Sequence, residues 1–207
     1  MSKGNFTDDI YNRIQSLEPE SVFIPTDFTD TADINTIRQI FMRFENEGKI
    51  KRILPGIYYN PTYSELLDEY EAPSPHNVAL AIARKLNWTI APSGNTALNQ
   101  LGLSTQVSAK WSYISDGPYK TYQFGNVEIE FKRRNNKEIS NMSYKSAMVI
   151  QALKELKKDN INSEIIDKLK RVLSQQEKTA LLEEGRKTTS WIYDIIKKIC
   201  AEVKTNV

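Results

Sequence analysis

The chain of 207 residues carries a formal net charge of +2, and 40% of its residues are hydrophobic. This composition excludes a mainly disordered chain, and no run of about eighteen apolar residues is present that could cross a membrane. One cysteine and one histidine exclude an internal disulfide and leave too few ligands for a multi-cysteine metal site. Because the N-terminus also lacks the apolar segment of a secretory signal, we expect a cytoplasmic protein with no membrane partner, no metal and no cofactor.

The first part of the chain has the spacing of three helical segments. Apolar residues recur at helical intervals over residues 10–17, and a short helical turn is expected at residues 26–28. A longer helix is predicted from an N-cap near Asp33 to Gly48, with Ile37, Phe41 and Phe44 on its apolar side. The order of elements is therefore helix, short helix and longer helix.

A basic hairpin is predicted directly after the longer helix, in the sequence KIKRILPGIYYNP at residues 49–61. Its first strand carries cations, and Pro55 and Gly56 suit the two central positions of a type II turn. Helix, short helix, longer helix and basic hairpin together predict a winged helix-turn-helix. In such a module the longer helix enters the major groove and the hairpin contacts the DNA backbone.

The candidate DNA-binding residues are the polar residues on the outward side of the longer helix and the residues of the hairpin. Asn and Gln can pair with adenine, Arg with guanine, and Thr with a base or a phosphate, while hairpin cations gain affinity from counterion release. The set is Asn35, Thr36, Arg38, Gln39, Arg43, Lys51, Arg52, Pro55 and Gly56.

The rest of the chain predicts a second domain of mixed structure. We expect a helix over residues 78–86, strands near 88–91, 111–115, 119–124 and 127–133, a helix over 94–101, and helices over 143–158, 163–173 and 188–203. The basic outer faces of the three last helices are interpreted mainly as solvated surface. The expected fold class is α+β, with a winged helix over residues 5–62 followed by an α/β domain with a C-terminal helical bundle over residues 74–203.

The stretch APSGNTALNQLGLSTQV at residues 91–107 has a structural interpretation of its own. Ser93 is expected to cap a helix, Gly102 to end it, and the leucines to face the core.

The combination of GKIKRILPGIYYNP, PSGNTALNQLGLSTQV, WSYISDG and VEIEFKRR resembles the AbiEi-type antitoxin family over roughly residues 10–134. The resemblance implies a non-enzymatic transcriptional autorepressor of a type IV toxin–antitoxin system concerned with abortive infection. It implies binding to operator DNA at inverted or paired repeats. It also implies a functional partner, a nucleotidyltransferase-like toxin that is counteracted without a stable complex. A plain winged-helix regulator without a toxin is an alternative.

A second alternative is a magnesium-dependent nuclease. Asp116 precedes Glu130 and Lys132 at a separation typical of sites in which two carboxylates hold the metal and a lysine activates water. The same residues are also explained by a turn at Asp116 and by the alternation of a half-exposed strand, so we expect no catalytic residues.

Overall fold

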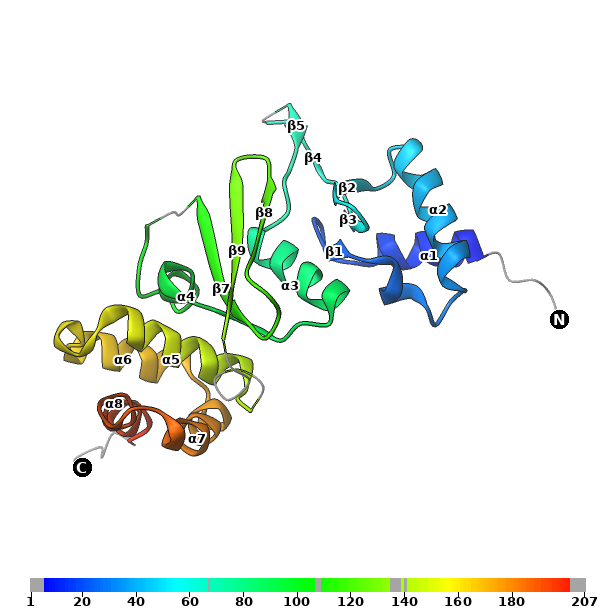
Figure 1. Cartoon of the computed structure of the whole chain (residues 1–207). Coiled ribbons are helices and arrows are strands. Elements are labelled where there is room, and N and C mark those ends of the chain that lie inside the picture. Colours follow the sequence, from blue (N-terminus) through cyan, green and yellow to red (C-terminus); the bar gives the residue numbers. More distant parts are fainter. Residues whose placement is uncertain (1–5, 67, 107–108, 135–138, 140, 202–207) are drawn as a thin grey trace. The chain divides into compact units, whose positions relative to one another are not determined.

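The computed structural model describes residues 6–66, 68–106, 109–134, 139 and 141–201 (Figure 1). The chain forms two compact units, and the first ends at Asn87. Helices and several small sheets occur together, which confirms the expected α+β class. In the described part of the chain, no helix has the length and apolar character needed to span a bilayer.

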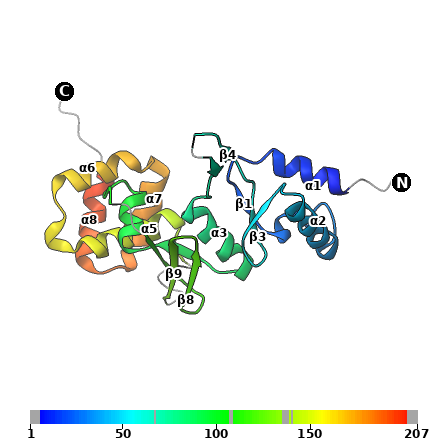
Figure 2. The same cartoon turned by 90° about the horizontal axis from the view of Figure 1, so that it is seen from above.

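In its described residues, the first unit contains three α-helices, one short 3-10 helix and five short strands. They are α1 (Phe6–Gln15), β1 (Val22–Phe23), η1 (Pro25–Phe28), α2 (Ile34–Asn46), β2 (Lys51–Leu54), β3 (Ile57–Tyr59), β4 (Tyr63–Ser64), β5 (Glu69–Tyr70) and α3 (Pro75–Leu86). An antiparallel sheet has the order β1-β3-β2, so the β2–β3 hairpin is joined by a strand from before α2. Figure 2 shows α1 and α2 beside this sheet.

The core of the first unit is built around one phenylalanine of α2. Phe41 is fully buried, and its ring meets the rings of Phe23, Phe28 and Tyr58 edge to face at centroid distances of 5.5, 5.4 and 5.2 Å. These partners come from β1, η1 and β3. The side of α2 expected to be apolar therefore ties all three elements to the helix.

Two segments of the first unit differ from the expected arrangement. The acidic stretch between the two expected domain ranges forms the β4–β5 hairpin, in which the rings of Tyr63 and Tyr70 meet edge to face at a centroid distance of 5.2 Å. Helix α3 groups with the first unit, whereas the sequence analysis placed residues 74–203 together. Arg84 of α3 donates to the carbonyl oxygen of Val22 at 3.1 Å and pairs with Asp27 at 3.1 Å, which explains this grouping.

The second unit contains a four-stranded sheet and a group of helices. Its elements are β6 (Ile90–Pro92), α4 (Gly94–Gln100), β7 (Lys110–Ser115), β8 (Lys120–Phe124), β9 (Val127–Arg133), α5 (Tyr144–Leu156), η3 (Lys158–Asn160), α6 (Ser163–Val172), α7 (Gln175–Glu184), η4 (Gly185–Lys187) and α8 (Ser190–Cys200). The strands predicted near 119–124 and 127–133 form the β8–β9 hairpin. However, β7 pairs with β9 in parallel, so the sheet order is β6-β7-β9-β8.

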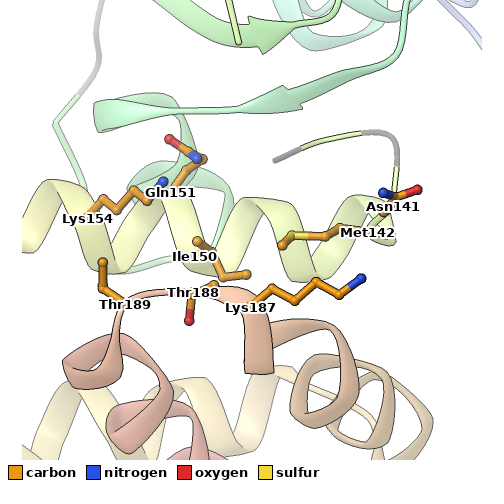
Figure 3. Close-up of a pocket in the computed structure, with 8 residues that line it drawn as sticks. All are labelled: Asn141, Met142, Ile150, Gln151, Lys154, Lys187, Thr188 and Thr189. Carbon is orange, nitrogen blue, oxygen red and sulfur yellow. The ribbon is translucent and has the colours of Figure 1, made fainter. Parts of the chain in front are cut away.

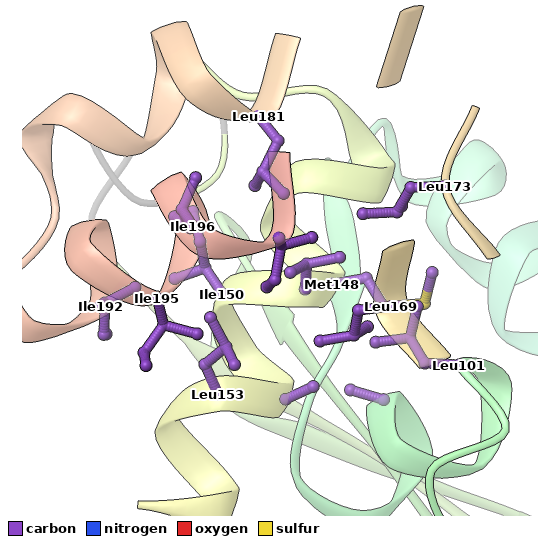
Figure 4. Close-up of a cluster of buried hydrophobic side chains, with 14 of the residues drawn as sticks. Leu101, Met148, Ile150, Leu153, Leu169, Leu173, Leu181, Ile192, Ile195 and Ile196 are labelled. Carbon is purple, nitrogen blue, oxygen red and sulfur yellow. The ribbon is translucent and has the colours of Figure 1, made fainter. Parts of the chain in front are cut away.

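A large apolar cluster joins the helices of the second unit. Leu153 of α5, Leu169 of α6, Leu181 of α7 and Ile196 of α8 are all buried in it (Figure 4). On the sheet, Ala147 of α5 packs against Ala91 and Ile114 in a smaller cluster. Helix α5 therefore lies between the sheet and the other helices, with buried side chains directed to both.

The sequence analysis missed helix α7. Its start is marked by a capping box, in which Ser174 and Glu177 each bond to the other's backbone N–H. Of its ten residues only Leu181 is buried, so the helix lacks the apolar stripe by which the other helices were predicted.

Candidate nucleic-acid interface

Helix α2 is fixed at its start by a side-chain cap. The Oδ1 atom of Asp33 accepts hydrogen bonds from the backbone N–H groups of Asn35 at 3.0 Å and Thr36 at 3.1 Å. The Thr36 hydroxyl also donates to Oδ2 of Asp33, at 2.5 Å. These hydrogen bonds hold the pKa of Asp33 below its usual value, the Thr36 hydroxyl having the largest effect. Thr36 thus serves the cap, and its hydroxyl is already engaged.

One side of α2 remains open to solvent. Asn35, Arg38, Gln39 and Met42 are all exposed, and their spacing of i, i+3, i+4 and i+7 places them in one row, called here the α2 stripe. The opposite side contains Ile37, which is 0% exposed. Within the described residues, the side chains of Arg38 and Gln39 form no hydrogen bond or ion pair. The α2 stripe therefore presents amide and guanidinium groups that are available to another molecule.

Arg43 does not belong to this open row. Its Nη2 atom donates to the hydroxyl of Thr7 in α1 at 2.8 Å, and its guanidinium lies 3.9 Å from Glu47. This candidate residue therefore braces α1 against α2.

The two cations of β2 have different surroundings. Lys51 is half-buried, and its Nζ atom lies 3.3 Å above the ring centre of Tyr70 in β5. Arg52 is exposed, and its Nε atom lies 3.1 Å from Oε1 of Glu45 in the last part of α2. Arg52 is thus the more accessible of the two, although a carboxylate already neutralises part of its charge.

The hydroxyl of the buried Tyr58 is influenced by charged residues of both α2 and β2. Burial raises the pKa of the Tyr58 hydroxyl, the charge of Glu45 raises it further, and the charges of Arg52 and Arg38 lower it. Tyr58 is paired directly with Arg52 across the β2–β3 ladder. The charges of Arg38 and Arg52 thus both act on this one hydroxyl group.

The hairpin turn at Pro55 and Gly56 is held by a residue from α3. Gly56 has a φ of 69°, the positive value that a type II turn needs at this position. The ammonium group of Lys85 donates to the carbonyl oxygen of Pro55, and a Cβ added to Gly56 would lie 3.3 Å from that group. The turn is therefore braced by a cation of the same unit.

The sequence analysis missed Lys85, Glu45 and Tyr70, the side chains that hold the hairpin residues. Lys85 lies 30 residues from Pro55 in the chain, and no local pattern indicates that contact. The charge of Glu45 is visible in the sequence, but its pairing with Arg52 depends on how the hairpin folds back on α2.

Of the three residues considered for a nuclease, Glu130 and Lys132 lie together, but Asp116 does not join them. Glu130 is buried, accepts hydrogen bonds from Ser112 at 3.2 Å and from Tyr119, and pairs with Lys132 at 3.2 Å and Lys110 at 3.2 Å. Glu130 pairs with Ser112 of β7 in the sheet. Asp116 follows Ser112 by four residues, a separation of about 13 Å for an extended chain.

Asp116 has a structural role of its own in the second unit. Its Oδ1 atom accepts the backbone N–H of Thr89 at 2.9 Å, which holds the turn after β7. Within the residues that the structure describes, no three His, Cys, Asp or Glu side chains gather as a metal site would need. The geometry therefore gives the nuclease alternative no support.

The sequence matches a family of unknown function, DUF6088, over residues 9–181. The chain belongs to this family. The DUF6088 match includes the α2 stripe, the β2–β3 hairpin and the sheet of the second unit, while α8 follows the matched region. No curated protein matches the sequence.

Proposed function

We propose that the first unit is a winged-helix DNA-binding module in which α2 is the recognition helix and the β2–β3 hairpin is the wing. The order α1, β1, η1, α2, β2, β3 and the sheet order β1-β3-β2 support this assignment. A recognition helix needs one side anchored in the protein and the other side free to enter the major groove.

The α2 stripe is the observation that carries the proposal. Its Asn35, Arg38 and Gln39 are the residue types that hydrogen-bond to base edges, and the exposed Met42 offers an apolar contact to a thymine methyl group. The buried opposite side fixes the helix, so these groups are presented without a large loss of conformational freedom on binding.

The wing supplies affinity that does not depend on base sequence. Arg52 contacts a DNA phosphate once a phosphate oxygen replaces the carboxylate of Glu45, and release of DNA counterions favours this exchange. Lys51, held over Tyr70, contributes less because it is half-buried. The hairpin therefore sets affinity, whereas the α2 stripe sets base preference.

At the level of the whole protein, we infer a non-enzymatic transcriptional regulator that represses its own operon from paired operator sites. Its role as the antitoxin of a nucleotidyltransferase-like toxin rests on the resemblance to the AbiEi-type family. A regulator without a toxin has the same first unit, so DNA binding and toxin neutralisation are tested separately.

The DNA-binding test is a titration of the full chain with the region upstream of its gene and with the same DNA in shuffled order. We expect at least tenfold tighter binding to the natural region, with an affinity that falls as salt rises. Equal binding to both sequences, or no binding, would refute the operator-binding proposal. Co-expression with the neighbouring reading frame then tests neutralisation: rescued growth supports an antitoxin, and unrelieved toxicity contradicts that role.

A further inference from the structure

The second unit contains a polar cavity of about 430 Å³ that the proposed function does not use. It lies between the start of α4, the end of β9 and one side of α5, and its polar and charged lining residues are Ser93, Lys132, Arg134, Gln151, Lys154 and Glu155. Gln151 and Lys154 also line an adjoining cavity of about 460 Å³, toward the segment that precedes α8. Figure 3 shows both side chains extending from the same side of α5.

Two largely buried polar side chains in this cavity have no hydrogen-bond partner among the residues that the structure describes. Ser93 is 7% exposed and Gln151 is 8% exposed. Ser93 occupies the N-cap position of α4, but its hydroxyl makes no cap hydrogen bond, so the capping role expected from the sequence is wrong. Neither side chain hydrogen-bonds to any residue in the described ranges. Polar atoms that line a cavity without a protein partner are typical of a ligand site.

The charge around these two groups is mainly positive. The polar cavity is lined by three cations, Lys132, Arg134 and Lys154, against one carboxylate, Glu155. Lys187 adds a fourth cation in the adjoining cavity. Part of the charge of Lys132 is used by Glu130, 3.2 Å away, and Lys154 is also engaged in an interaction within the protein. The remaining excess favours an anion that can accept several hydrogen bonds.

The start of helix α8 adds to this preference. Thr189, its N-cap residue, lines the adjoining cavity and makes no side-chain cap. The N–H of Ile192 donates to the carbonyl oxygen of Thr189, so among the described residues only the N–H groups of Ser190 and Trp191 are left for an external acceptor. The N-terminus of a helix of this length carries a partial positive charge that stabilises anions.

We propose that the two cavities form one binding site for a small phosphate-bearing molecule of nucleotide size. The cations bind the phosphate, while the Gln151 amide and the Ser93 hydroxyl hydrogen-bond to the uncharged polar part of the ligand. An amide both donates and accepts, so Gln151 suits a nucleobase edge. Each cavity lies within the usual range of about 300–1,000 Å³ for small-molecule sites.

Gly94, the residue after Ser93 at the edge of the polar cavity, has a distinctive backbone conformation. Gly94 has a φ of 56°, a left-handed value that favours glycine, and a Cβ at this position would lie 3.7 Å from Oε2 of Glu155. A side chain would make only an ordinary contact there, so the left-handed backbone rather than a lack of space explains the glycine beside Ser93.

Calorimetric titration of the full chain tests this site, with AMP, ATP, pyrophosphate and inorganic phosphate as probes. At least one probe is expected to bind saturably, and Gln151→Leu and Lys154→Met should each weaken it by about tenfold or more. Lys198→Met removes an exposed cation of α8 outside both cavities and should leave the affinity unchanged. Ser93→Ala, a change small enough to keep the fold, should weaken binding by a few-fold. Thermal unfolding without ligand checks that each variant is folded.

Three results would overturn the proposal. The first is the absence of saturable binding by every probe, and the second is equal weakening by Lys198→Met. The third is binding of a single-stranded oligonucleotide without binding of any small probe, which would assign the cations to a nucleic-acid chain. None of these results depends on whether the first unit binds operator DNA.

Discussion

The Nε atom of Arg52 in β2 lies 3.1 Å from the Oε1 atom of Glu45 in α2. Both side chains are partly exposed, so this ion pair contributes at most about 1 kcal/mol to stability. Its larger effect is on binding, because the carboxylate of Glu45 competes with a DNA phosphate for the same guanidinium. The ion pair thus joins the hairpin to α2, and the carboxylate reduces the positive charge that the hairpin presents to DNA.

Removing this competition should strengthen DNA binding. We expect Glu45→Gln to bind the upstream region several-fold more tightly than the natural protein, with a salt slope steeper by about one. Fluorescence anisotropy at several salt concentrations measures both quantities. Glu164→Gln, which removes an exposed carboxylate of α6 in the second unit, serves as the matched control. Equal effects of the two substitutions would assign the gain to net charge alone.

The aromatic core predicts a sharp contrast between two adjacent residues of α2. Phe41→Ala should lower the free energy of unfolding of the first unit by about 3–5 kcal/mol, because it leaves a cavity among three aromatic rings. Met42, which is 60% exposed, should tolerate Ala within about 0.5 kcal/mol. Urea unfolding followed by circular dichroism compares the two variants. Similar losses for both would contradict the orientation of α2.

The buried carboxylate of Glu130 predicts a loss of stability in acid. Burial raises its pKa, but hydrogen bonds from Tyr119, Lys132 and Lys110 more than offset this, so the pKa is about 2. A lowered pKa means that the stabilisation is complete above the ordinary glutamate value of 4.5 and is lost as the pH falls toward 2.

Glu130→Gln isolates this contribution. At pH 7 the variant should be less stable by roughly 2 kcal/mol, and the difference from the natural protein should shrink as the pH falls from about 4.5 to 2. Chemical unfolding across this pH range measures it, with the exposed Glu183→Gln as control. A difference that stays constant with pH would show that the carboxylate charge is not the source of the stabilisation.

Two glycines of the second unit should differ in their tolerance of alanine. A Cβ on Gly117 would lie 2.3 Å from Cε2 of Trp88, whose ring packs against Phe131 at 5.6 Å. Gly117→Ala should therefore cost about 3 kcal/mol and alter the near-ultraviolet circular dichroism of the tryptophans. Gly125→Ala meets no atom within 4 Å but has a φ of 52°, so about 1 kcal/mol of strain is expected. A smaller loss at Gly117 than at Gly125 would contradict the packing of Trp88.

Local sequence patterns predicted where helices and strands form better than they predicted which strands pair with each other. The spacing of Ile37, Phe41 and Phe44 placed the buried side of α2, because helical periodicity is a property of the segment itself. Alternation likewise predicted the strands of the second sheet. The parallel pairing of β7 with β9 was not predictable in this way. The turn after β7 does not determine whether β7 pairs with β8 or with β9, so the pairing depends on tertiary packing.

The side-chain environments of the candidate sites were the least predictable part. Arg43 and Arg38 look alike in the sequence, yet one is bound to Thr7 and the other is open to solvent. Ser93 and Gln151 line one cavity although 58 positions separate them, and nothing near either residue indicates the other. Such relationships arise only from tertiary packing.

The central claim, that α2 reads bases while the hairpin binds the backbone, is tested most directly by the ratio of affinities for natural and shuffled upstream DNA. The account predicts that Arg38→Ala/Gln39→Ala reduces this ratio about tenfold or more. It also predicts that Lys51→Ala/Arg52→Ala weakens both affinities alike with a shallower salt slope, and that Lys157→Ala/Lys158→Ala changes neither. An unchanged ratio in the Arg38→Ala/Gln39→Ala protein, with its fold intact, would contradict the assignment of α2 as the recognition helix.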